Sequence, residues 1–213
     1  ILKNSYRVVP AFYKLHPDGS EEKIAVRDIA MEDDHFGYNN GKIVYAAYQP
    51  DARWGNRQFT SIRLLDVTTG EEKKLVTRSK YFSPDISHDG KNIIAVEADA
   101  SLKSAVRIMN TDGQPSDYVL SRNGIVFSNP KFSSDDQHYF VAARNVKGEM
   151  ALLKYGLGKD SASSEQTILP FANRIIGFLS VQGDTLAFSM QYQGRDEIFA
   201  FIYGKEKKDN YSL

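Results

Sequence analysis

The chain has 213 residues, and its 27 Lys and Arg balance its 27 Asp and Glu, so the formal net charge is zero. Without excess charge the protein lacks the field that draws a chain to nucleic acid or to an anionic membrane, and we predict neither partner. Cysteine is absent, which excludes disulfides and thiolate metal sites. No apolar run approaches the roughly 18 residues of a membrane-spanning helix, so we expect no direct membrane insertion.

Two short patterns recur along the chain with a spacing of roughly 45 to 50 residues, the range of propeller blades. In the first, a polar turn precedes an apolar run, and these turns lie near Gly41, Gly90, Asp136 and Gly183. In the second, an alternating run ends in a glycine turn, at Gly19, Gly70, Gly113, Gly158 and Gly204. Alternation that ends in Asp-Gly or Thr-Gly is typical of β-hairpins.

Each repeat therefore predicts four short antiparallel strands, which we term inner, second, third and outer. No stretch sustains a helical apolar period. We predict an all-β fold, a β-propeller of four-stranded antiparallel blades, with four complete blades and a partial one. The expected limits are 1–28 for the partial blade, then 29–77, 78–121, 122–169 and 170–213. Such a set either closes as a five-bladed propeller or forms part of a larger ring.

The stretch SPDISHDGKNIIAV, residues 83–96, contains Ser, His and two Asp close together and could be taken for an active site. Its pattern returns in residues 129–143, where Pro84 aligns with Pro130, Ser87 with Ser133 and Asp89 with Asp135. A repeated turn places its residues once per blade, whereas catalysis needs them at one point. We interpret this stretch as a structural turn in which Ser and Asp side chains bind local backbone amides.

The stretch SPDISHDGKNIIAV, followed by VRIMNTDG, resembles the WD-like repeat of TolB-type propellers. His88 stands where that repeat has a second Pro, and the copy at residues 133–137 has diverged further. Residues 48–75 also resemble the propeller sections of exported Bacteroidetes envelope proteins. The resemblance implies a periplasmic or outer-membrane-associated, exported protein. The abrupt start at Ile1, without signal peptide, leads us to expect a section of a longer chain.

The sequence contains no recognisable catalytic motif, no metal-ligand spacing and no phosphate-binding loop. We therefore predict no catalytic residue, no metal site and no cofactor in this chain, and leave open whether the parent protein is an enzyme. A carbohydrate-active propeller would require the inner-strand acids Asp85, Asp135 and Asp184 to converge at the axis.

Binding residues are expected on the loops between second and third strands, which carry charge and vary from repeat to repeat. The longest such loop holds Asp51, Arg53, Trp54 and Arg57, and the last holds Arg195 and Glu197. Arg and Trp are enriched among recognition residues, although Trp54 could equally pack against the blade rim.

The leading hypothesis is a non-catalytic propeller module that binds a protein or peptide, or scaffolds adjacent domains of the same polypeptide, in a bacterial envelope protein. The alternative is an accessory gating propeller of a larger peptidase whose catalytic domain lies outside this sequence. The carbohydrate-active five-bladed propeller is the third candidate.

Overall fold

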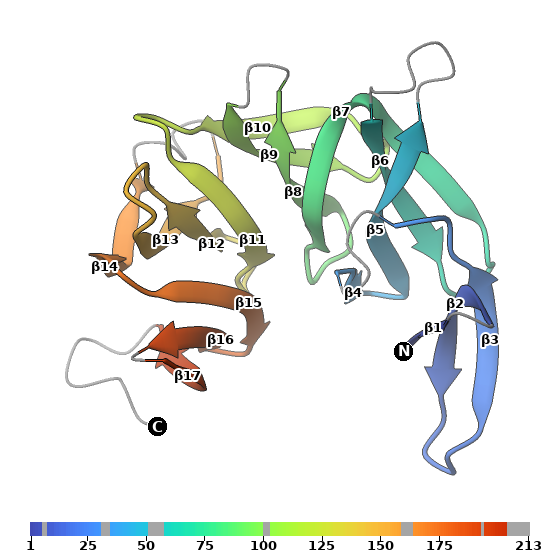
Figure 1. The fold of residues 1–213 in the computed structure, drawn as a ribbon. Helices are drawn as coiled ribbons and strands as arrows, with labels where there is room; N and C mark the ends of the chain where they lie inside the picture. The colour runs from blue at the N-terminus through green and yellow to red at the C-terminus, as the bar shows by residue number, and fades with distance from the viewer. Residues whose placement is uncertain are drawn as a thin grey trace.

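The computed structural model describes residues 1–5, 8–30, 35–50, 58–99, 103–158, 164–192 and 194–203. These residues form strands and turns and no α-helix, which confirms the predicted all-β class. It follows that no helix in the described ranges could cross a membrane. The sheets follow one another around an arc, with the first and last sheets at its two ends (Figure 1).

The strands are short and come in hairpin order. In chain order they are β1 (Leu2–Ser5), β2 (Val8–Leu15), β3 (Glu21–Val26), β4 (Gly37–Asn39), β5 (Lys42–Pro50), β6 (Gln58–Asp66), β7 (Glu72–Ile86), β8 (Asn92–Ala98), β9 (Ser104–Asn110), β10 (Pro115–Leu120), β11 (Val126–Phe132), β12 (His138–Arg144), β13 (Met150–Gly156), β14 (Gln166–Ala172), β15 (Ile175–Gln182), β16 (Thr185–Tyr192) and β17 (Arg195–Ile202).

The strands form five successive antiparallel blades. Strand β7 belongs to two of them, because its first half pairs with β6 and its second half with β8. Blade 1 is β1–β3, blade 2 is β4–β6 with the first half of β7, blade 3 is the second half of β7 with β8–β10, blade 4 is β11–β14, and blade 5 is β15–β17. Blades 2, 3 and 4 are four-stranded, as the repeat predicts, and the fold is a β-propeller.

The end blades differ from the prediction in their strand content. Blade 1 was expected to contribute only its second half, yet the short strand β1 gives it a second, a third and an outer strand. Blade 5 was expected to have four strands, and three lie within the described residues. The proposed repeat limits stay a prediction; the limit between residues 169 and 170 falls inside β14.

Four apolar clusters hold the blades together, one at each interface between successive blades. The cluster between blades 3 and 4 contains Val96 and Val106 from one side and Tyr139 and Val141 from the other. Phe140, which lies between Tyr139 and Val141 on the same strand, faces the opposite way and belongs to the cluster between blades 4 and 5. Strand β12 is therefore buried on both faces, and a blade is stable only between its neighbours.

The predicted structural turn is confirmed in blades 3 and 4. The Ser133 hydroxyl donates to Asp135 at 2.5 Å and accepts from the His138 amide at 3.0 Å. The Ser87 hydroxyl makes the same contacts with Asp89, at 2.7 Å, and with the Asn92 amide, at 2.9 Å. The hydrogen bond from Ser87 and that from the Lys91 amide lower the pKa of Asp89.

The pKa of Asp135 is also lowered, because hydrogen bonds from Ser133 and the Gln137 amide outweigh the opposing effect of partial burial. A carboxyl group whose pKa is lower in the folded than in the unfolded protein stabilises the fold at any pH above its unfolded-state pKa. This stabilisation is lost as the pH falls through its folded-state pKa.

Replacing Ser133 with Ala should destabilise the protein by about 1–2 kcal/mol, because a buried amide and a carboxylate lose their partner. The loss should be full above the ordinary pKa of an Asp side chain, about 4, and should shrink only as the pH falls below it, through the lowered pKa of Asp135. Urea unfolding of both proteins across this pH range measures the difference. Ser134→Ala is the matched control and should leave stability unchanged or slightly raised, since the Ser134 hydroxyl has no partner among the described residues.

Candidate functional site

The inner strands of blades 3, 4 and 5 share a β-bulge at the same position. The pairing register shifts around Ser83 in β7, around Asn129 in β11 and around Gly177 in β15. Ser83 and Asn129 take positive φ angles of 47° and 51°, which side chains other than glycine rarely adopt. A bulge bends the strand and redirects the residues that follow it.

Hydrogen bonds connect these bulges from blade to blade. The Ser83 hydroxyl donates to the Asn129 side-chain oxygen at 3.3 Å, and the Asn129 amide nitrogen donates to the Gly177 carbonyl at 3.1 Å. The bulges therefore also align the inner strands of three blades around one axis.

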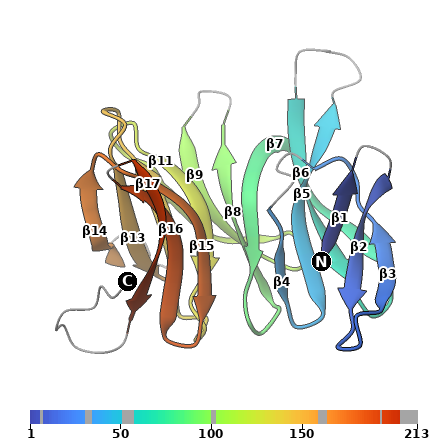
Figure 2. The ribbon, with the colours of Figure 1, turned by 60° about the horizontal axis from the view of Figure 1, so that its bottom comes forward.

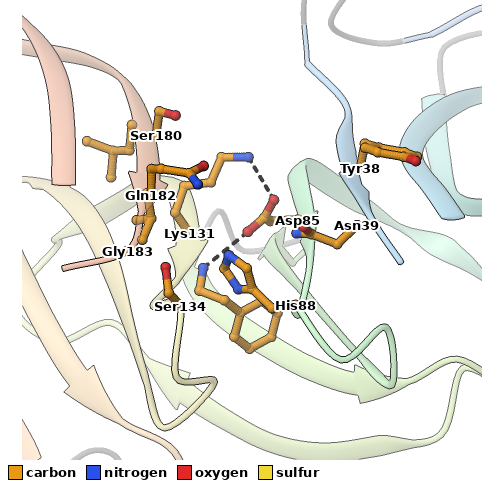
Figure 3. Close-up of a pocket in the computed structure, with 12 residues that line it drawn as sticks. Tyr38, Asn39, Asp85, His88, Lys131, Ser134, Ser180, Gln182 and Gly183 are labelled. Carbon is orange, nitrogen blue, oxygen red and sulfur yellow. Dashed lines mark hydrogen bonds and ion pairs between the residues drawn. The ribbon is translucent and has the colours of Figure 1, made fainter. Parts of the chain in front are cut away.

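Beyond the bulges, the inner strands of four blades end around a cavity of about 480 Å³, which we call the axial cavity. This volume lies in the range of small-ligand sites. Figure 3 shows side chains from β4, β7, β11 and β15 pointing toward the same space. The lining residues are Tyr38, Asn39, Asp85, His88, Lys131, Phe132, Ser134, Leu179, Ser180, Val181, Gln182 and Gly183.

An ion pair between blades 3 and 4 dominates the cavity. Lys131 Nζ lies 2.8 Å from Asp85 Oδ1, and the Phe132 amide donates to Asp85 Oδ2 at 3.1 Å (Figure 3). The Asp85 and Lys131 side chains are only 9% and 18% exposed. Both oxygens of Asp85 therefore have a donor, and the charge of Lys131 is compensated within the site.

The turns around the cavity are also tied together across blades. Asp136 in blade 4 accepts hydrogen bonds from the amides of His88 and Asp89 in blade 3, both at 2.9 Å. The His88 ring nitrogen Nδ1 lies 3.3 Å from the same carboxylate. On the other side of blade 3, the Asn40 side chain donates to the Asp89 carbonyl at 3.0 Å. The mouth of the cavity is thus built from the turns of three blades.

Of the binding residues that we predicted on the loops, Asp51, Arg53, Trp54 and Arg57 lie outside the described residues. The other two, Arg195 and Glu197, do not line this cavity. Arg195 is exposed and Glu197 half-buried at the start of β17, opposite Tyr192 and Met190 at the end of β16. The cavity instead adjoins Gln182, just before β16 begins, so the length of this strand, roughly 25 Å, separates the two places. In Figure 2, β17 begins at the upper edge and the turn between β15 and β16 lies at the lower edge.

The three inner-strand acids do not converge. Asp85 lies in the cavity, whereas Asp135 and Asp184 are exposed in turns. Nor does any cluster of three His, Asp or Glu side chains suited to a metal ion occur within the described ranges. The arrangement that a carbohydrate-active propeller would need is therefore not found in this part of the chain.

The sequence did contain a signal for the axial cavity. The alignment that pairs Pro84 with Pro130 also pairs Asp85 with Lys131, which places opposite charges at equivalent positions of neighbouring inner strands. The repeat pattern assigns Asp85 to a structural turn, because the bulge that directs its side chain inward has no distinct sequence pattern.

No protein-family model matches the sequence, and no curated protein matches it. Similar solved structures include TolB from Acinetobacter baumannii, with 12% identity and a TM-score of 0.65 over 93% of this chain and 47% of that chain. An acylaminoacyl peptidase from Pyrococcus horikoshii has 10% identity and a TM-score of 0.59, over 84% of this chain and 32% of that one.

The β-propeller domain of the Trilobed protease from Pyrococcus furiosus has 11% identity and a TM-score of 0.52, over 84% of this chain and 65% of that domain. The chain thus spans about half of TolB and a third of the peptidase. These likenesses establish a TolB-like β-propeller fold.

Removing one member of the axial ion pair should be more harmful than removing both. Lys131→Met leaves a buried carboxylate without its cation and should destabilise by about 3 kcal/mol. The double variant Asp85→Asn, Lys131→Met should recover most of this loss, because the Asn oxygen can still accept from the Phe132 amide. Denaturant unfolding of the two single variants and the double variant gives the interaction free energy between the Asp85 and Lys131 side chains. Additive losses would show that the two side chains do not interact.

Proposed function

We propose that this chain is a non-catalytic, TolB-like propeller module that binds a protein or peptide, and that the axial cavity is where an inserted segment of that partner is held. The observation that carries the proposal is the convergence of four blades on one polar cavity of about 480 Å³. Sites of this kind, built where several elements meet, are the usual places for ligands in proteins.

The cavity has the mixed character of a recognition site. Its lining includes Phe132 and Leu179, which are almost fully buried, and polar side chains such as Asn39 and Gln182. Polar groups beside such apolar contacts can hold one end of an extended segment and fix its orientation. The start of β17 lies at the opposite end of the blades and is a second candidate surface for the same partner, together with the predicted binding residues Asp51, Arg53, Trp54 and Arg57.

A role as the accessory propeller of a larger peptidase is the second candidate. Two of the similar structures named above are a peptidase and the propeller domain of a protease, and this chain spans only part of each. In that case the axial cavity would contact a peptide on its way to a catalytic domain elsewhere in the polypeptide. For either role we propose an exported, periplasmic or outer-membrane-associated protein, on the basis of the repeat resemblance.

Selection of a random phage-displayed peptide library on this protein tests the proposal. Peptides that bind should lose at least about tenfold in affinity on the variant Gln182→Trp, because the indole fills the mouth of the cavity without altering the core. Gln182 is exposed, so the variant should fold.

The matched control is Gln114→Trp, at an exposed position in the turn between β9 and β10. It should bind the selected peptides as well as the natural sequence does. Failure to enrich any peptide, or equal binding to the Gln182→Trp variant, would contradict a peptide site in the axial cavity.

A further inference from the structure

The charges inside the axial cavity are balanced before any ligand arrives. Asp85 and Lys131 neutralise each other, and each oxygen of Asp85 already accepts a hydrogen bond, one from Lys131 and one from the Phe132 amide. A ligand carboxylate would bring an uncompensated negative charge beside Asp85, and a ligand ammonium would bring a positive charge beside Lys131. The neutral pair offers no free counter-charge to a charged ligand, and burying a charge without a counter-charge is costly, so the cavity disfavours both.

The cavity offers both donors and acceptors. The Ser134 hydroxyl is buried without a hydrogen-bond partner in the described part of the chain, and it lines the cavity. The Gln182 carboxamide lines the same cavity (Figure 3), and no hydrogen bond occupies it within those residues. A hydroxyl and a carboxamide can each donate and accept. A buried polar atom without a partner is costly, so a ligand group that pairs with Ser134 is favoured.

The surroundings add to the selection against acids. Asp135 and Asp184 are exposed in the turns that follow the lining residues Ser134 and Gly183. Neither forms an ion pair with a Lys or Arg among the residues described; Asp135 lies 3.6 Å from His138. These two carboxylates follow lining residues directly and disfavour a further negative charge beside them.

We propose that the axial cavity accepts an uncharged carboxamide group, as on an Asn or Gln side chain, and that the Asp85–Lys131 pair makes it discriminate against carboxylates. This inference rests on the proposed function and specifies the segment that the peptide inserts. A carboxamide fits because it carries a donor and an acceptor on one planar group, so it can pair with Ser134 and Gln182 whether each of them donates or accepts. A carboxylate of the same shape can only accept.

Acetamide and acetate, which have nearly the same shape, are suitable probes. Titration of the ¹⁵N-labelled chain should move the backbone amide signals of Ser134 and Gln182 at a concentration about fivefold lower for acetamide than for acetate. Sodium chloride at matched concentration controls for ionic strength. Asp85→Asn frees the charge of Lys131 and should reverse the order, with acetate binding about tenfold tighter than to the natural sequence.

Asp112→Asn is the matched control, because it makes the same chemical change at an exposed turn position away from the cavity. It should leave both titrations unchanged. Ser134→Ala provides a second variant that should fold normally, since its hydroxyl has no partner in the described residues, and it should weaken acetamide binding about threefold.

If acetate binds the natural sequence as tightly as acetamide does, the proposed selectivity is wrong, and the proposed peptide site still stands. If neither probe moves these signals, the carboxamide site is wrong. The proposed function is then judged separately, by whether library-selected peptides still lose affinity on the Gln182→Trp variant.

Discussion

The structure depends on the burial of sheet faces between successive blades. Strand β12 shows the constraint directly, because Tyr139, Val141 and Ala143 pack against blade 3 while Phe140 and Ala142 pack against blade 5. A sheet that is apolar on both faces cannot be stable in water by itself, and each blade is held only by its neighbours. The arc in Figure 1 is the consequence of stacking such sheets radially.

The same constraint leaves the two ends of the arc with apolar side chains at the surface. Phe178 and Ile198 of blade 5 are 57% and 77% exposed, and Val9 and Leu15 of blade 1 are 63% and 53% exposed. Exposed apolar groups gathered on one sheet mark a surface that contacts another protein segment. The proposed module would offer these two faces to a partner or to an adjacent domain.

Polar groups on the inner strands are organised by the same stacking. Bulges at Ser83, Asn129 and Gly177 join neighbouring blades by hydrogen bonds, and the residues two positions further along include the Asp85–Lys131 pair. The axial cavity is thus a property of several blades at once. Its shape and charge depend on apolar packing farther out, so changes at a blade interface will alter the cavity without touching its lining.

The sequence by itself determined the all-β class, the four-stranded repeat and the role of its Ser-x-Asp turns, because each follows from local pattern: alternation, glycine turns and side chains that bind nearby amides. Only the tertiary structure decided where a ligand can bind. Asp85, Lys131, Ser134 and Gln182 come from three blades, and their convergence requires bulges and blade packing that no local pattern specifies. The sequence pointed to the loops because charge and Trp are visible there, whereas the geometry of the axis depends on contacts between residues more than 40 positions apart.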